Sequence, residues 1–168
     1  MRGMRNLPLR TVALAGALAG AFALAVAHIA ELGFGLVPCA LCLWERWPYR
    51  VVLVLGLLAA MLPPRHARWL LALMLLAVLA DAAMAITHVG VEFRWWRSPL
   101  PECSAPALGG GSIAERFAAM PARPAKPCDD PTFLIPGLPL SMAAMNLLFA
   151  LVFSAFLGIF TFRRSLPR

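Results

Sequence analysis

Cys39 and Cys42, two cysteines separated by two residues, are the side chains of this chain best suited to chemistry. A cysteine thiolate is both a nucleophile and a metal ligand. Arg46 follows Cys42 by four positions, so both side chains lie on one face if the segment is helical. A second pair, Cys103 and Cys128, is separated by 25 positions. These thiols allow two chemistries, thiol–disulfide exchange and metal binding.

The spacing of the second pair argues against a zinc site. Structural zinc sites usually have two closely spaced pairs, whereas Cys103 and Cys128 are far apart and no histidine lies between them. We therefore expect no metal. Two structural disulfides are the other alternative, but a bridge between Cys39 and Cys42 would close a small, strained loop, and strained disulfides are the labile, catalytic kind. The Cys103–Cys128 bridge alone could be structural.

The composition places these cysteines in a membrane protein. The chain has 168 residues, of which 61% are hydrophobic and 14% charged, and its mean hydropathy is +0.79. Soluble domains carry about 25% charged residues. We predict a single membrane domain, residues 1–168, whose apolar surface is covered by lipid. Its fold class is all-α, a bundle of four transmembrane helices.

Four apolar runs are the predicted spans, because a helix needs about 20 residues to cross a bilayer. They cover about 11–30, 43–62, 69–88 and 140–162. The second run is short between Val51 and Leu62, so its helix must begin near Leu43 and include Pro48. Although Ala25-Val26-Ala27 resembles a signal-peptide cleavage site, we expect the first helix to be retained.

The net charge of +7 is a topology signal. Basic residues without acidic neighbours occur in three places: Arg2, Arg5, Arg10, Arg65, Arg68, Arg163, Arg164 and Arg168. The segment from 89 to 140 instead balances five basic against five acidic residues. The positive-inside rule then puts both termini in the cytoplasm and the loops 31–42 and 89–139, with all the cysteines, in the periplasm outside a bacterial inner membrane. The absence of a basic patch with interleaved aromatics argues against nucleic-acid binding.

Asp81, His28 and His88 are ionisable residues within or at the ends of the first and third predicted spans. Asp81 is expected either to make a structural hydrogen bond, to Thr87, Asn146 or a backbone group, or to handle protons. His28 and His88 lie near the outer ends of their helices. We expect both histidines to be interface or packing residues rather than metal ligands.

The second periplasmic loop contains one predicted helix. Ser112-Ile113-Ala114-Glu115 has the pattern of a capping box, and Phe117 and Met120 continue from Ile113 at helical spacing. This predicts a short amphipathic helix lying on the membrane surface.

The position of Cys42 favours a reactive thiol. A helix that begins near Leu43 places Cys42 at its N-terminal end, where the helix dipole and Arg46 stabilise an anion. We therefore expect Cys42 to be the better-stabilised thiolate and to lie deeper in the membrane, with Cys39 nearer to water. The Arg46 guanidinium could donate to a carbonyl oxygen of an electron acceptor in the lipid. Its alternatives are a pair with Glu45 or a lipid phosphate.

The run from Pro38 to Tyr49, PCALCLWERWPY, resembles the signature of the disulfide bond formation protein B (DsbB) family. The four predicted spans and the segment Leu138–Ala143 leading to Asn146 are also similar. The resemblance implies a four-helix membrane enzyme that reoxidises a DsbA-like periplasmic thiol oxidase and reduces a quinone, ubiquinone or menaquinone. The alternative of a different class is a membrane scaffold or transport component with structural disulfides.

The resemblance also implies a role for each cysteine. Cys103 would be attacked by the reduced partner, Cys128 would exchange with Cys39, and Cys42 would face the quinone with assistance from Arg46. Gly109-Gly110-Gly111 and Arg94-Trp95-Trp96-Arg97 have no counterpart in the motif, which leaves open whether the partner is a general or a dedicated oxidase.

Overall fold

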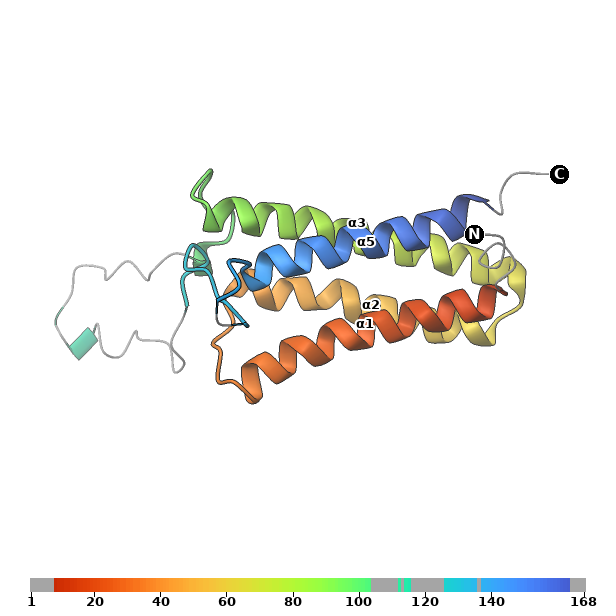
Figure 1. The fold of residues 1–168 in the computed structure, drawn as a ribbon, viewed down its shortest axis with the longest axis horizontal. Coiled ribbons are helices and arrows are strands. Elements are labelled where there is room, and N and C mark those ends of the chain that lie inside the picture. The colour runs from red at the N-terminus through yellow and green to blue at the C-terminus, as the bar shows by residue number, and fades with distance from the viewer. Residues whose placement is uncertain (1–7, 104–111, 113, 116–125, 136, 164–168) are drawn as a thin grey trace.

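The computed structural model describes residues 8–103, 112, 114–115, 126–135 and 137–163, and their regular structure is helical. There are four long helices: α1 (Leu9–Leu32), α2 (Ala40–Met61), α3 (Pro64–Glu92) and α5 (Met142–Arg163). A short 3-10 helix, η2 (Pro101–Cys103), follows α3. The helices form an elongated bundle in which α2 packs between α1 and α3, and α5 packs against α3 (Figure 1).

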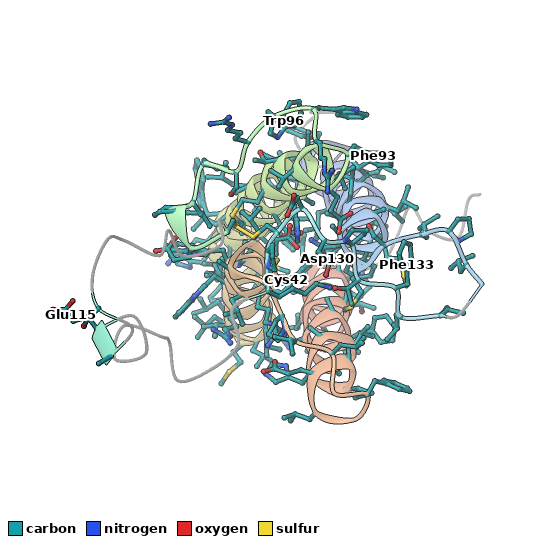
Figure 2. The ribbon with its side chains drawn as sticks, turned by 90° about the vertical axis from the view of Figure 1, so that its left-hand side faces the viewer. Cys42, Phe93, Trp96, Glu115, Asp130 and Phe133 are labelled. Carbon is teal, nitrogen blue, oxygen red and sulfur yellow. A yellow bond between two sulfur atoms is a disulfide. The ribbon has the colours of Figure 1, made fainter. Side chains whose placement is uncertain are left out.

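The cysteines gather at one end of this bundle. The start of α1, the α2–α3 link and the end of α5 lie at the opposite end, on the right of Figure 1. Arg10, Arg65 and Arg68 are therefore remote from the segment that joins α1 to α2 and carries Cys39. Seen along the bundle from the cysteine end, Cys42 lies near the middle, among the helices (Figure 2).

Three of the helices, α1, α3 and α5, are long and apolar enough to cross a membrane. The helix α2 is not apolar enough by the same criterion, because it contains three charged residues, Glu45, Arg46 and Arg50. The helices α1 and α3 extend beyond their predicted spans at both ends, and α3 begins at Pro64, where a proline is accepted at the first helical position. The start of α2 at Ala40 matters more, since the predicted start was near Leu43.

The helix predicted after Ser112 lies largely outside the described residues. The two hydrogen bonds of the capping box are present: Ser112 N–H donates to Glu115 Oε2 at 2.7 Å, and Glu115 N–H donates to Ser112 Oγ at 3.3 Å.

A buried polar chain joins three helices inside the bundle. Tyr49 Oη on α2 donates to Asn146 Oδ1 on α5 at 2.7 Å, and Asn146 Nδ2 lies 3.4 Å from Asp81 Oδ2 on α3. Asp81 is fully buried. Of the partners expected for Asp81, the structure brings Asn146 to it, whereas Thr87 donates to the carbonyl of Ala83. The three side chains therefore fix the relative positions of α2, α3 and α5.

Gly56 permits the close approach of α1 and α2, and its replacement by alanine tests that packing. A Cβ at Gly56 would lie 2.7 Å from the carbonyl oxygen of Ala13 and 2.9 Å from Cβ of Ala17. We expect Gly56→Ala to destabilise the protein by about 1–3 kcal/mol, the usual cost of overpacking. Thermal unfolding in detergent measures the change. Gly158→Ala is the control, since a Cβ there meets nothing within 4 Å. Equal shifts for the two variants would contradict the prediction.

Candidate active site

Cys39 occupies the N-cap position of α2, and this assigns the stabilised thiolate to it rather than to Cys42. Its Sγ accepts the N–H of Cys42 at 3.3 Å and lies 3.1 Å from the Cys42 Sγ. The side-chain hydrogen bond with Cys42 lowers the pKa of Cys39 below its usual value; burial opposes this, and the backbone N–H of Cys42 adds to it. The prediction that Cys42 is the better-stabilised thiolate was wrong, because α2 begins three residues before Leu43. The N-cap thus falls on Cys39.

Cys39 was expected to lie nearer to water than Cys42, but the structure covers Cys39 more completely. The expected position of Cys42 deeper in the membrane stays a prediction. Cys39 is only 4% exposed, whereas Cys42 is half-buried. Cys39 packs with Leu41, Val91 and the disulfide between Cys103 and Cys128. The loop that carries the disulfide therefore covers Cys39 from the side expected to be open to water.

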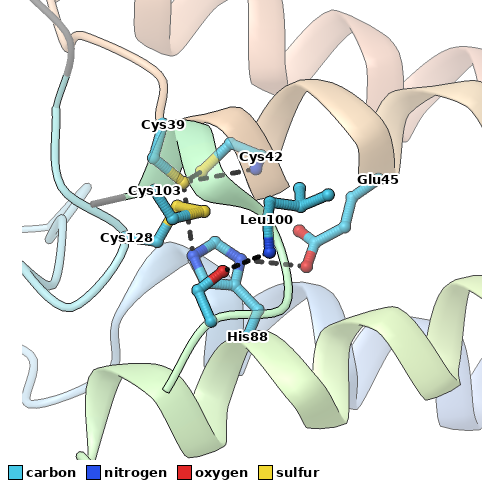
Figure 3. Close-up of a disulfide and its surroundings, with 8 residues drawn as sticks. Cys39, Cys42, Glu45, His88, Leu100, Cys103 and Cys128 are labelled. Atoms are coloured by element: carbon cyan, nitrogen blue, oxygen red, sulfur yellow. Dashed lines mark hydrogen bonds and ion pairs between the residues drawn. A yellow bond between two sulfur atoms is a disulfide. The ribbon is translucent and has the colours of Figure 1, made fainter. Parts of the chain in front are cut away.

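A buried histidine lies beside Cys39, and a buried carboxylate contacts that histidine. His88 Nε2, near the C-terminal end of α3, lies 3.4 Å from Cys39 Sγ, and His88 Nδ1 lies 2.9 Å from Glu45 Oε1 on α2 (Figure 3). His88 is 2% and Glu45 6% exposed. The order thiol, imidazole, carboxylate is the arrangement in which a base activates a nucleophile and a third group orients the base. His88 is therefore placed to exchange a proton with Cys39.

The contacts among Cys39, His88 and Glu45 were not predicted from the sequence, where His88 was expected to be an interface or packing residue. The contact joins α2 and α3 across 43 positions, so no local spacing reveals it. The available signal was Glu45, a carboxylate one turn after Cys42 that would be costly inside a bundle without a partner.

The disulfide joins Cys103, at the end of η2, to Cys128, with their Cα atoms 4.9 Å apart. Both residues are buried, at 5% and 1% exposure. Cys39 and Cys42 are free thiols. The structure thus brings all the cysteines predicted from the sequence into one cluster, with one pair oxidised and the other reduced (Figure 3).

A cavity of about 300 Å³ opens beside Cys42. Its walls come from the second half of α1, the α1–α2 link, the first half of α2, the chain before α5 and the start of α5. Most of the lining is apolar, with Phe22 and Phe149 among it. The polar exceptions include Glu31, Glu45, Arg46 and Asn146. A largely apolar concavity with a few placed polar groups is typical of a small-molecule site. Cys42 lines this cavity, and Cys39 does not.

Arg46 lies in the wall of the cavity and has an unexpected partner. Its Nη1 donates to Glu31 Oε2 on α1 at 2.6 Å, rather than to Glu45 as one alternative had it. The Arg46 side chain is 9% exposed. Its Nε is buried without a hydrogen-bond partner among the described residues. Because a buried unsatisfied donor costs about 1–3 kcal/mol, this N–H is suited to an acceptor atom of a ligand in the cavity.

Comparison with known proteins gives two findings. The model of the family described as disulfide bond formation protein DsbB matches residues 9–160, nearly the whole chain. An uncharacterized protein of Rickettsia prowazekii (strain Madrid E), RP370, is 32% identical over 142 residues, which cover 83% of this chain and 80% of that protein. No solved structure matches the chain.

Proposed function

Because the chain belongs to the DsbB family, whose members are membrane thiol oxidoreductases, we propose that it reoxidises a DsbA-like periplasmic dithiol oxidase and passes the electrons to a membrane quinone. One observation carries the proposal. Cys39 packs against the Cys103–Cys128 disulfide, whereas Cys42, hydrogen-bonded to Cys39, lines the apolar cavity. The inner pair therefore connects an outer disulfide to a small-molecule site.

The proposal includes a fourth span, α2, in a bacterial inner membrane. The charged side chains that lower its hydropathy turn inward, since Glu45 and Arg46 are both buried. Its outer surface is apolar and aromatic, with exposed Trp44, Trp47 and Val54 among others, and is suited to contact with lipid. With the basic end of the bundle in the cytoplasm, the cysteines lie on the periplasmic side, where disulfides persist.

The cavity fits a quinone. A quinone has a flat apolar ring with carbonyl oxygens, and the cavity combines aromatic walls with the unpartnered Nε–H of Arg46. When bound, a quinone supplies an acceptor for two electrons and two protons. Arg46 would hold a carbonyl oxygen, and Cys42 would face the ring.

The proposed sequence of exchanges is the one that membership of the DsbB family implies, and the clustering of the four cysteines supports it. A thiolate of the reduced partner attacks Cys103 and releases Cys128, which attacks Cys39 in its disulfide with Cys42. The second partner thiol then attacks the mixed disulfide, which forms the partner's disulfide and releases Cys103. Cys103 attacks Cys128 in its disulfide with Cys39, so the Cys103–Cys128 bond forms again and Cys39 and Cys42 are left reduced. The pair Cys39–Cys42 is oxidised again as its two electrons and two protons leave toward the cavity, with His88 placed to accept the proton of Cys39. The arrangement of one bonded and one free pair is compatible with the stage just before this last step.

The test is a coupled assay with the purified full-length protein in detergent. We expect a reduced thioredoxin-fold dithiol to be oxidised and a soluble quinone analogue to be reduced in equal amounts, followed by thiol titration and quinone absorbance. If the folded protein, with its cysteines intact, reduces no quinone, the proposal fails.

Replacement of Arg46 tests the quinone site separately. We expect Arg46→Gln, combined with Glu31→Gln so that no carboxylate is left unpaired, to raise the KM for quinone about 10- to 100-fold, since a hydrogen bond from a charged donor contributes about 1.5–3 kcal/mol. The rate of thiol exchange with the partner should not change. Arg50→Gln is the control, because the Arg50 guanidinium lies over the Trp47 ring at 4.9 Å and not in the cavity wall. An unchanged KM in the double variant would refute the role of Arg46.

A further inference from the structure

We propose that the reduced site binds a thiophilic divalent cation of the Zn²⁺ type, with Cys39, Cys42 and His88 as ligands. Their ligand atoms all lie within 4.8 Å of one another. The Cys39 Sγ is 3.1 Å from the Cys42 Sγ and 3.4 Å from the His88 Nε2. Zinc binds sulfur at about 2.3 Å and imidazole nitrogen at about 2.0–2.1 Å, so ligand atoms this close can share one ion after small side-chain shifts.

Glu45 prepares His88 for this role. Its carboxylate is bound to Nδ1 at 2.9 Å, which leaves Nε2 directed at the two sulfur atoms. Histidines that bind metals almost always have their second ring nitrogen held by such a carboxylate or carbonyl, which fixes the ring and raises its basicity. Two thiolates neutralise a divalent charge, and Glu45 adds a further negative charge behind the imidazole.

The cavity gives the ion an entry path and an open coordination position. Cys42 lines it directly, and Glu45 is also part of its wall. Three protein ligands and one open position are the arrangement of catalytic rather than structural zinc sites. The wide spacing of the second cysteine pair argues against a zinc site built from cysteines alone, but here the third ligand is a histidine from a different helix, α3.

Binding depends on the redox state of the inner pair. Only thiolates bind the ion, so a Cys39–Cys42 disulfide removes two of its three ligands. On binding, any proton remaining on the two thiols is displaced to water, and no electron is transferred. The bound ion then withholds both sulfurs from oxidation. This inference goes beyond the proposed function, since binding requires neither quinone nor a thiol partner.

The experiment uses the full-length protein in detergent, reduced and free of quinone. Cys103→Ser with Cys128→Ser removes the outer thiols, which could otherwise bind metal themselves. Titration with Cd²⁺ is followed by thiolate-to-metal charge-transfer absorption, and Zn²⁺ is then added in competition. We expect one ion per chain, and loss of binding after the inner pair is oxidised.

Variants in the same background identify the ligands. We expect Glu45→Gln to weaken binding about 10- to 100-fold, the usual effect of losing the partner of a metal-binding histidine, and His88→Ala to weaken it at least as much. His28→Ala is the control, because His28 is exposed and its Nδ1 lies 2.7 Å from the Leu24 carbonyl oxygen. Thermal unfolding identifies any variant that has lost its fold. If His88→Ala is unfolded, Glu45→Gln still tests the site.

Wild-type affinity in the folded variants, or equal binding by the oxidised protein, would overturn the proposed site. In the coupled assay, Zn²⁺ should inhibit quinone reduction and a chelator should restore it. A protein that binds the ion but reduces no quinone would instead contradict the proposed function alone.

Discussion

Cys42→Ala is expected to abolish quinone reduction, because Cys42 is the thiol that lines the cavity and a lone Cys39 cannot form the inner disulfide. The variant should oxidise at most about one equivalent of dithiol and then stop. Quinone absorbance and trapping of the partner's thiols measure the two effects. Turnover of quinone at the wild-type rate would exclude Cys42 from the electron path.

The same variant should raise the pKa of Cys39, since the side-chain hydrogen bond with Cys42 is the main cause of its lowered value. A lowered pKa keeps Cys39 a thiolate at pH values where an ordinary cysteine is protonated. Alkylation of Cys39 should therefore continue to lower pH in Cys42→Ser, whose hydroxyl can still donate, than in Cys42→Ala. Identical pH profiles for the two variants would show that this hydrogen bond does not set the pKa.

Cys103→Ser is the matched control for the electron path. It removes the outer disulfide but leaves Cys39, Cys42 and the cavity in place. We expect it to lose oxidation of the protein dithiol, yet to reduce one equivalent of quinone when the inner pair has been reduced beforehand. The two variants thus separate the outer exchange from the inner electron transfer.

His88→Ala is expected to lower turnover about 100-fold or more, the usual contribution of a positioned acid–base group. The imidazole lies 3.4 Å from Cys39 Sγ and is held by Glu45, so its removal takes away the base beside Cys39 and leaves a buried carboxylate unpaired. Steady-state turnover with saturating quinone and dithiol measures the loss. His28→Ala, at an exposed position on α1, should retain full turnover.

Glu45→Gln separates the orienting role from the proton transfer. Glutamine can still hydrogen-bond to His88 Nδ1, so we expect a smaller loss than in His88→Ala. If His88→Ala turns over normally while folded, Cys39 loses its proton to another group, and the chain of Cys39, His88 and Glu45 is structural.

The sequence predicted the broad architecture because long apolar runs and the cysteine motif are local signals. The helices follow those runs, and the family model confirms the resemblance. The start of α2 could not be placed to the residue, since cysteine is not among the usual N-cap residues and Leu43 looked like the first member of the apolar run. That difference of three residues reversed the expected roles of Cys39 and Cys42 as thiolates.

The polar contacts of the site depend on how the helices pack, which a single sequence does not encode locally. A partner for Asp81 could be expected because a carboxyl group inside a span requires one, and Asn146 was one of the alternatives. Glu31 and Arg46, by contrast, are joined by the packing of α1 on α2, and several acceptors were open to Arg46. His88 and Glu45 are joined by the packing of α2 on α3.

The burial of the outer disulfide has a consequence for how the enzyme meets its environment. With Cys103 and Cys128 at 5% and 1% exposure, a thiol in solution cannot reach either sulfur without a local opening of the covering chain. A large protein surface can compensate for the cost of that opening with new contacts, whereas a small free thiol offers none. Burial of the outer disulfide therefore keeps small thiols from reacting with it, and the proposed exchange requires a protein partner whose docking exposes Cys103.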